Sequence, residues 1–286
     1  MLGILLVLAS TASFTGAVVL LAVGARSNPT RSGVRLLSST VGGRPGLIGE
    51  ILNVTGWILE ILGLARVSLT MTQVLGTTGQ VMVVGLAAAV LREPLRRRDV
   101  LGAGAVIAGV TIVGFVPPSR SNSLPGLRQL VWLVLLLGPI ALAPHILRRT
   151  GRPRGPALCA VGAGMAYSLS GLSTKGLTDA LVSHRWLPGL LALAGVFGFG
   201  FLASISELEA LQRGRAVTVV PLETALDTII PIVCAPIFFA ERWPAGTTAQ
   251  TLLAGGILLT LLGGVVLARD AAPVLARHAA APAPNP

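Results

Sequence analysis

Nine long runs of apolar residues alternate with short polar connections along the 286-residue chain. Each run holds roughly 20 residues, which is the length that a helix needs to cross about 30 Å of hydrocarbon. The pattern therefore predicts an all-α integral membrane protein with nine transmembrane helices. The expected spans are 2–24, 46–65, 68–91, 99–117, 129–147, 156–175, 186–211, 216–240 and 247–268.

The composition agrees with a membrane environment and excludes a water-soluble domain. Hydrophobic residues make up 53% of the chain, charged residues make up 12%, and the mean hydropathy is +0.80. No basic residue precedes the first apolar run, whereas Arg26 follows it, so we expect a retained first helix rather than a cleaved signal peptide. The connections are too short to hold a folded domain outside the membrane.

The net charge of +11 comes mainly from arginines in the short connections. Clusters of this kind are found in nucleic-acid-binding proteins, but here the positive-inside rule explains them better, and we expect no nucleic-acid partner. Sixteen of the 22 basic residues fall in connections that share the inner side if the N-terminus lies outside. We therefore expect the N-terminus outside and the C-terminus inside a plasma membrane. The excess of Arg over Lys favours a bacterial inner membrane.

Two segments far apart in the chain share one pattern. "ARVSLTMTQVLGTTGQVMVVGLAAAVLREPL" begins at Ala65, and "QRGRAVTVVPLETALDTIIPIVCAPIFFAERWP" begins at Gln212. Each has a basic start, a span with polar residues in its first half, an acidic end at Glu93 or Glu241, and a Gly-rich span after it. Five expected crossings separate the copies, so they would lie in opposite orientations, which is typical of alternating-access transporters. The expected units are a first half of four helices (1–118), a second half of five helices (128–270) and a disordered cytoplasmic tail (271–286).

These segments, together with "GMAYSLSGLSTKGL" around Lys175, resemble the drug/metabolite transporter (DMT, EamA-like) superfamily. They are nearest in pattern to its NIPA-type magnesium transporter branch, and the resemblance covers nearly the whole chain. It implies two inverted halves around a central cavity, and the export or exchange of small metabolites, drugs or ions. The resembling families carry a lysine at the place of Lys175, which implies a role for this residue.

The eighth span carries two acidic residues within an apolar stretch, "VVPLETALDTIIPIV". Glu223 and Asp227 are four residues apart and so share one helical face, and Asp227 would lie near the middle of the bilayer. Because a lipid-facing carboxylate is costly there, we expect this face to point into the bundle or into a wet cavity. The pair is a candidate site for proton exchange or cation binding; hydrogen bonding to neighbouring Ser and Thr is the structural alternative. Pro221 and Pro231 are expected to break the helix, or else to kink it.

Other spans also carry polar residues at helical spacing. In the second span, Glu50, Asn53, Trp57 and Glu60 are spaced to line one face, and Glu60 is the deep member of the set. Glu60 therefore joins Glu223 and Asp227 as a candidate coupling residue. The residues that we predict to line a shared lumen are Asn53, Trp57, Gln73, Thr77, Gln80, Tyr167, Ser170, Lys175 and Glu207. The alternatives are hydrogen bonding between helices for the Gln and Thr residues, and snorkelling to the interface for Lys175.

The sequence contains no motif for hydrolysis, phosphate binding or metal ligation beside these features. We therefore expect no enzyme activity and no cofactor. The leading hypothesis is a secondary transporter that moves a small metabolite, drug or ion by alternating access, coupled to an ion through buried carboxylates. The alternatives are a NIPA-like transporter of Mg²⁺ or another divalent cation, and a non-transporting membrane scaffold or accessory subunit. The Gly-rich fourth and ninth spans suit either a packing seam within the chain or a homodimer.

Overall fold

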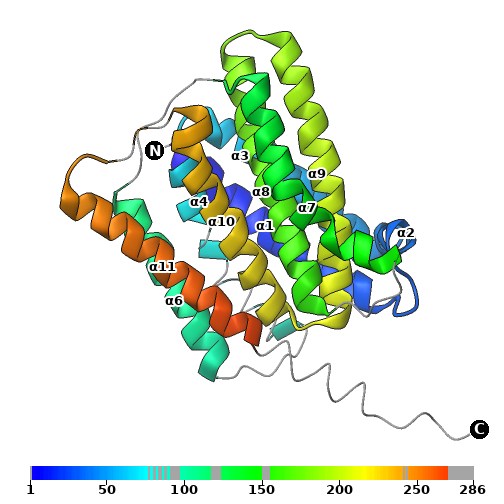
Figure 1. Ribbon diagram of the computed structural model, residues 1–286. Helices are drawn as coiled ribbons and strands as arrows, with labels where there is room; N and C mark the ends of the chain where they lie inside the picture. Colours follow the sequence, from blue (N-terminus) through cyan, green and yellow to red (C-terminus); the bar gives the residue numbers. More distant parts are fainter. Residues whose placement is uncertain are drawn as a thin grey trace, which may run out of the picture.

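The computed structural model shows the chain as a bundle of α-helices (Figure 1). It describes residues 2–76, 78–79, 82, 86, 89–90, 97–116, 124–149, 155–240, 242 and 244–269. The helices are α1 (Leu2–Arg26), α2 (Val34–Val41), α3 (Arg44–Leu64), α4 (Leu69–Gly76), α6 (Arg97–Phe115), α7 (Leu127–Arg149), α8 (Pro156–Val182), α9 (Trp186–Arg213), α10 (Ala216–Phe239) and α11 (Thr247–Arg269). No β-strand occurs among these described residues, so the expected all-α fold is confirmed for them.

Most of the expected spans correspond to single long helices. The span expected at 68–91 is the exception, because beyond α4 only a few isolated residues of it are described. α8 continues past the expected end at residue 175 to Val182. The short helix α2 was not expected, since its eight residues are too few to give a membrane-span signal. The expected tail over 271–286 lies outside the described residues.

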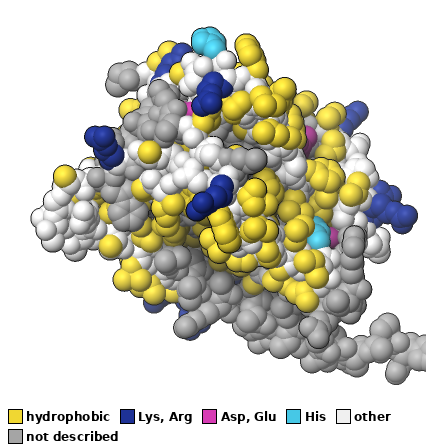
Figure 2. All heavy atoms as spheres, turned by 45° about the horizontal axis from the view of Figure 1, so that its top comes forward, with side chains coloured by type: hydrophobic (Ala, Val, Ile, Leu, Met, Phe, Trp, Pro, Cys, Tyr) yellow, Lys and Arg dark blue, Asp and Glu magenta, His cyan; other side chains and the backbone are white. Residues whose placement is uncertain are grey.

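The described helices have the length and surface of membrane spans. Six segments are long and apolar enough to cross a membrane: Leu2–Arg26, Arg44–Leu64, Arg128–Leu147, Pro156–Val182, Trp186–Arg213 and Thr218–Phe239. Large hydrophobic side chains are exposed on their outer faces, including Ile51 and Ile58 on α3 and Leu187 on α9. Figure 2 shows such side chains over much of one face of the molecule. An exposed apolar surface of this extent indicates contact with lipid, so the chain is a multi-pass membrane protein. Nine crossings and an outside N-terminus stay predictions.

Small residues allow the helices of the bundle to approach closely. α1 packs along α3, and α8 packs against α7, α9 and α10. A Cβ atom on Gly56 of α3 would lie 2.9 Å from the ring of Phe14, and one on Gly164 of α8 would lie 3.0 Å from the carbonyl oxygen of Glu223. Side chains larger than hydrogen would push these helices apart. The glycines therefore bring the polar faces of α3, α8 and α10 toward the same interior space.

At one end of the bundle, the last residue of α1 and the segment that follows it bind to the end of α9. Arg26 donates hydrogen bonds to the carbonyl oxygens of Leu211 and Gly214, at 3.3 and 3.2 Å. The backbone N–H of Gly33, just before α2, donates to Oε1 of Glu209 at 2.9 Å. Glu209 is fully buried. α9 begins just after the α8–α9 connection and ends beside these contacts. The contacts therefore lie at the end of the bundle opposite that connection.

α10 is one continuous helix from Ala216 to Phe239, so the expected helix breaks at Pro221 and Pro231 are wrong, while the alternative of a kink stays a prediction. Proline removes one backbone hydrogen bond but has a φ angle that a helix accepts. Pro231 is buried among neighbouring helices, whose packing holds the segment helical. Because Pro231 has no N–H, the carbonyl oxygen of Asp227 lacks the donor that it would have in a regular helix.

Candidate functional site

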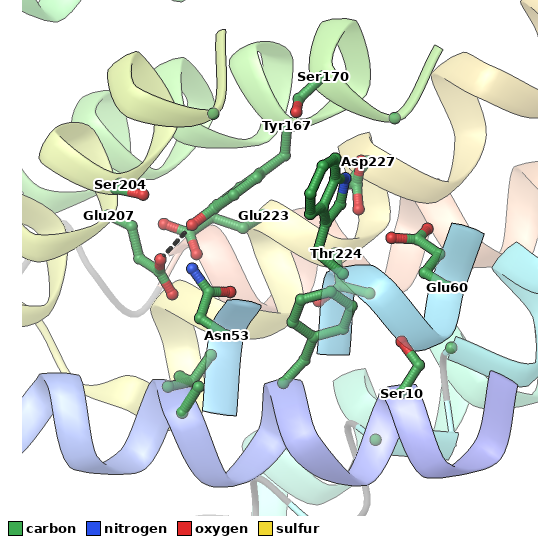
Figure 3. Close-up of a pocket in the computed structure, with 18 of the residues that line it drawn as sticks. Ser10, Asn53, Glu60, Tyr167, Ser170, Ser204, Glu207, Glu223, Thr224 and Asp227 are labelled. Atoms are coloured by element: carbon green, nitrogen blue, oxygen red, sulfur yellow. Dashed lines mark hydrogen bonds between the residues drawn. The ribbon is translucent and has the colours of Figure 1, made fainter. Parts of the chain in front are cut away.

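A cavity of about 420 Å³ lies inside the bundle, between helices from both halves of the chain (Figure 3). Its wall is built mainly by α1, α3 and α4 on one side and by α8, α9 and α10 on the other. The polar residues of α3 lie on this wall because their spacing places all of them on one face of the helix, and that face points into the cavity. The same spacing places Glu223 and Asp227 of α10 on this wall.

The structure brings most of the predicted site residues together in this cavity. Those on its wall are Glu60, Glu223, Asp227, Asn53, Trp57, Gln73, Tyr167, Ser170 and Glu207. Thr77 and Gln80 lie outside the described residues. Lys175 is described but does not line this cavity. The predicted set is therefore spatially compact except for these three residues.

Glu207, Tyr167 and Glu223 form a polar group at one end of the cavity (Figure 3). The Tyr167 hydroxyl donates a hydrogen bond of 2.5 Å to Oε2 of Glu207, which joins α8 to α9. Asn53 of α3 lies beside this group in the same view. Glu223 is 5% exposed, and its Oε1 has no hydrogen-bond partner among the described residues. A buried carboxylate oxygen without a protein donor is costly, and a bound group in the cavity would satisfy it.

Glu60 and Asp227 lie at the other end of the cavity, on α3 and α10 (Figure 3). Their carboxyl groups are close enough to interact electrostatically. Two ionised carboxylates that face each other across a cavity repel unless a proton or a cation lies between them. Glu60 and Asp227 thus form a second acidic pair, built by two helices that the sequence separates by more than one hundred and fifty residues.

Aromatic side chains line the cavity between the acidic groups. Trp57 donates a hydrogen bond from Nε1 to Oγ1 of Thr174 at 3.3 Å, which fixes the indole ring against α8. Its ring centroid lies 5.8 Å from that of Phe197, with 55° between the planes. Phe14, Phe201 and Tyr167 also line the cavity. The sequence offered little sign of this group, because aromatic residues make up only 4% of the chain.

Lys175 was predicted to line the lumen, and the structure corrects this prediction. Its Nζ lies 2.7 Å from Oδ1 of Asp179, four residues further along α8, and both side chains are almost completely buried. α8 turns Ser170 and Thr174 toward the cavity, and residue 175 stands about 100° further around the helix. The lysine therefore neither lines the cavity nor reaches the interface by snorkelling.

Several wall residues were missed by reasoning from the sequence. Ser10, Thr11 and Thr15 of α1 line the cavity, as do Ser204 of α9 and Thr224 of α10. Hydroxyl groups are poor markers of a lumen, because they satisfy themselves within a helix, as the Thr15 hydroxyl does by donating to Thr11 O at 2.8 Å. The one usable signal was the polar cluster "STASFT" in an otherwise apolar first span.

The charged side chains among the described residues of the cavity wall are all acidic. Five of the eleven acidic residues line the cavity, namely Glu50, Glu60, Glu207, Glu223 and Asp227. No Lys, Arg or His side chain is among the described residues that line it. Within the described part of the chain, no group of three or more His, Cys, Asp or Glu side chains is arranged to hold a metal ion. The cavity is therefore suited to positively charged or protonated groups rather than to anions.

Comparison with known proteins gives one family match. The EamA-like transporter family matches residues 2–115, which span α1 to α6. For these residues the match confirms the EamA-like resemblance seen in the sequence; it does not distinguish a magnesium-transporting branch. None of the curated proteins and none of the solved structures matches the chain.

Proposed function

We propose that this protein is a multi-pass secondary transporter that moves a small solute through the central cavity by alternating access. The observation that carries the proposal is the acidic cavity between helices from the two halves of the chain. The EamA-like match over residues 2–115 supports the same function independently. An interior space lined by ionisable groups is costly to maintain in a membrane protein and is typical of solute or ion pathways.

The packing of the helices supports the proposed inverted halves, residues 1–118 and 128–270. In the proposed repeat, α4 corresponds to α10 and α6 to α11, so that α1 and α3 correspond to α8 and α9. The pairs α1–α3 and α8–α9 each pack along their length, and α6 packs directly on α11 (Figure 1). Such an arrangement would let one half rock against the other around a site near the midplane.

Glu223, Asp227 and Glu60 are the proposed coupling residues. Each lines the cavity, and Asp227 faces Glu60 from the opposite wall. A pair of facing carboxyl groups binds a proton or a cation, and it releases one when the other arrives. This exchange would couple solute movement to an ion gradient, with Tyr167 and Glu207 shaping the adjoining end of the cavity.

The two alternatives receive less support. A dehydrated divalent cation prefers several oxygen ligands at once, and the described residues contain no group of three acidic or metal-binding side chains arranged for it. A scaffold has no need of an acidic interior space. We place the transporter in the plasma membrane of a bacterium, with the basic connections inside. A homodimer is compatible with this proposal.

Transport in proteoliposomes tests the proposal. Vesicles loaded with a pH dye and a Mg²⁺ dye would hold the wild type, Asp227→Asn or Asp227→Glu, the last of which keeps the charge. A transported solute added to the vesicles should cause proton release through the wild type, seen as a change of the pH-dye signal. Asp227→Asn should reduce this change by about tenfold or more, because it removes the carboxylate that exchanges charge. Asp227→Glu should keep part of the activity.

The outcomes separate the candidate functions. Mg²⁺ entry without a pH gradient, lost in Asp227→Asn, would favour the divalent-cation transporter. Full proton coupling in Asp227→Asn would remove this residue from the mechanism. A wild type that moves no solute, together with full complementation of a deletion strain by Glu223→Gln/Asp227→Asn, would favour the scaffold.

A further inference from the structure

The cavity wall combines negative charge with aromatic rings to a degree that the composition does not predict. Five of the chain's twelve aromatic residues and five of its eleven acidic residues meet there. No basic side chain is among the described residues of the wall. Carboxylates attract any cation, whereas aromatic faces attract those whose charge is spread over a weakly hydrated organic group. The two together are more selective than either alone.

The aromatic part of the wall has a fixed geometry. Trp57 is held by its hydrogen bond to Thr174 and by the tilted contact with Phe197. A ring that is held in place on its edge and on one side can present its remaining face to a ligand without losing further freedom. Trp57 also lies on the same face of α3 as Asn53 and Glu60, so it stands between the two acidic ends of the cavity.

The acidic part of the wall contains groups that a ligand would satisfy. Oε1 of Glu223 and Oγ1 of Thr228 are buried and have no hydrogen-bond partner among the described residues, and both residues line the cavity. Glu207 differs, because it already accepts a hydrogen bond from Tyr167. On α10, Glu223 lies one helical turn before Asp227, and Thr228 follows Asp227 directly. The unsatisfied oxygens of Glu223 and Thr228 point to a positively charged or proton-donating ligand group at this stretch of α10.

We propose that the transported solute is an organic cation with an apolar, aromatic-compatible body, whose charged group lies near Glu223 and Asp227 and whose body packs on Trp57 and Phe197. This inference rests on the proposed function and names the substrate class of the same cavity. A hydrated metal ion would leave the aromatic wall without a partner. An anion would meet five acidic residues without a basic residue among the described lining groups.

Binding to purified protein tests the proposal separately from transport. The full chain in detergent would be titrated with tetramethylammonium, tetraethylammonium and tetraphenylphosphonium, with MgCl₂ as the metal probe. Tetraphenylborate has the shape of tetraphenylphosphonium and the opposite charge, so it controls for apolar binding. Glu223→Gln removes the charge of Glu223 and Glu223→Asp retains it. Trp57→Leu removes the ring, and Trp132→Leu is its matched control on the exposed face of α7.

Tetraphenylphosphonium should bind more tightly than the two smaller cations, and tetraphenylborate should not compete with it. Glu223→Gln should weaken binding by about tenfold or more because a charged partner is lost, and Trp57→Leu should weaken it by about tenfold. Trp132→Leu should bind as the wild type does. Glu223→Asp, which keeps the charge on a shorter side chain, should lose less affinity than Glu223→Gln. Unchanged melting temperatures would show that the variants are folded.

The proposal is overturned if the folded wild type binds none of the three cations, if tetraphenylborate binds equally well, or if Trp57→Leu has no effect on affinity. Proteoliposome flux of other solutes in the absence of cation binding would overturn the substrate class and leave the transporter intact. Cation binding without flux of the bound cation would instead overturn the transport function and leave the binding site.

Discussion

Lys175 illustrates how a single residue can be misread when its sequence neighbours are polar. It follows Ser170 and Thr174 closely in sequence, yet only those two reach the cavity. The lysine pairs with Asp179 at 2.7 Å, and the two side chains are 1% and 0% exposed. A buried ion pair contributes less to stability than its short distance suggests, because both charges lose their hydration. Removing only one of the two charges is nevertheless strongly destabilising, because the other charge stays buried without its partner.

Lys175→Met is expected to destabilise the protein by about 3–5 kcal/mol, because it leaves Asp179 buried without the charge that it pairs with. Lys175→Met/Asp179→Leu should recover much of this loss, since it removes both charges and keeps similar volume. Thermal unfolding in detergent measures both variants. Arg128→Met, at an exposed basic residue of α7, is the control for the loss of a positive charge. A double variant as unstable as the single one would contradict the pairwise explanation.

At the scale of elements, the Gly-rich helices α6 and α11 form a seam inside the chain. A Cβ on Gly109 would lie 2.6 Å from the carbonyl oxygen of Gly256 and 2.7 Å from the backbone nitrogen of Thr260. The sequence allowed either a seam of this kind or a dimer contact, and for Gly109 and Gly256 the structure places the contact within one chain. Gly104, also on α6, has no atom within 4 Å of the corresponding Cβ position.

Gly109→Ala should therefore destabilise the protein by about 1–3 kcal/mol, because the new methyl group meets backbone atoms that cannot move without separating the helices. Gly104→Ala adds the same methyl group to the same helix at an open position, and it should leave stability unchanged or slightly improved. The measurement is the melting temperature of each variant in detergent. Equal losses in both variants would contradict the seam explanation, because only Gly109 has backbone atoms of α11 beside its Cβ position.

For the whole molecule, the contacts of α9 predict which connections share a side of the membrane. Ser38 of α2 lies near the C-terminal end of α9, while Ser183 precedes its N-terminal end. Both serines are exposed, whereas Cys159 and Cys234 are buried free cysteines. A cysteine introduced at either serine should therefore be labelled without strong background from the native thiols.

With the basic connections inside, an impermeant maleimide added to intact cells should label Ser183→Cys and should label Ser38→Cys only after the membrane is opened. The difference follows from the opposite ends of α9 at which the two positions lie. Labelling with the reverse pattern would invert the predicted orientation. Labelling of both positions in intact cells would contradict a transmembrane α9.

The prediction from sequence succeeded where the physical constraint is local. Asn53, Trp57 and Glu60 share a face because the helical period is fixed, and their span was recognisable because its apolar length matches the membrane. α2 was not predicted, and the helix break expected at Pro231 is absent from α10. Both depend on packing against neighbouring helices, which holds segments that local preference alone would leave short or broken.

The sequence by itself determined a membrane-embedded helical bundle with acidic faces, because hydrophobic length and helical period act within each segment. Only the tertiary structure decided which faces meet. It placed Glu60 opposite Asp227, packed the tilted rings of Trp57 and Phe197 against each other, and turned Lys175 away from the cavity. The rotation of each helix is set by the fit of small and large side chains against helices distant in the chain, and this fit has no local signature in the sequence.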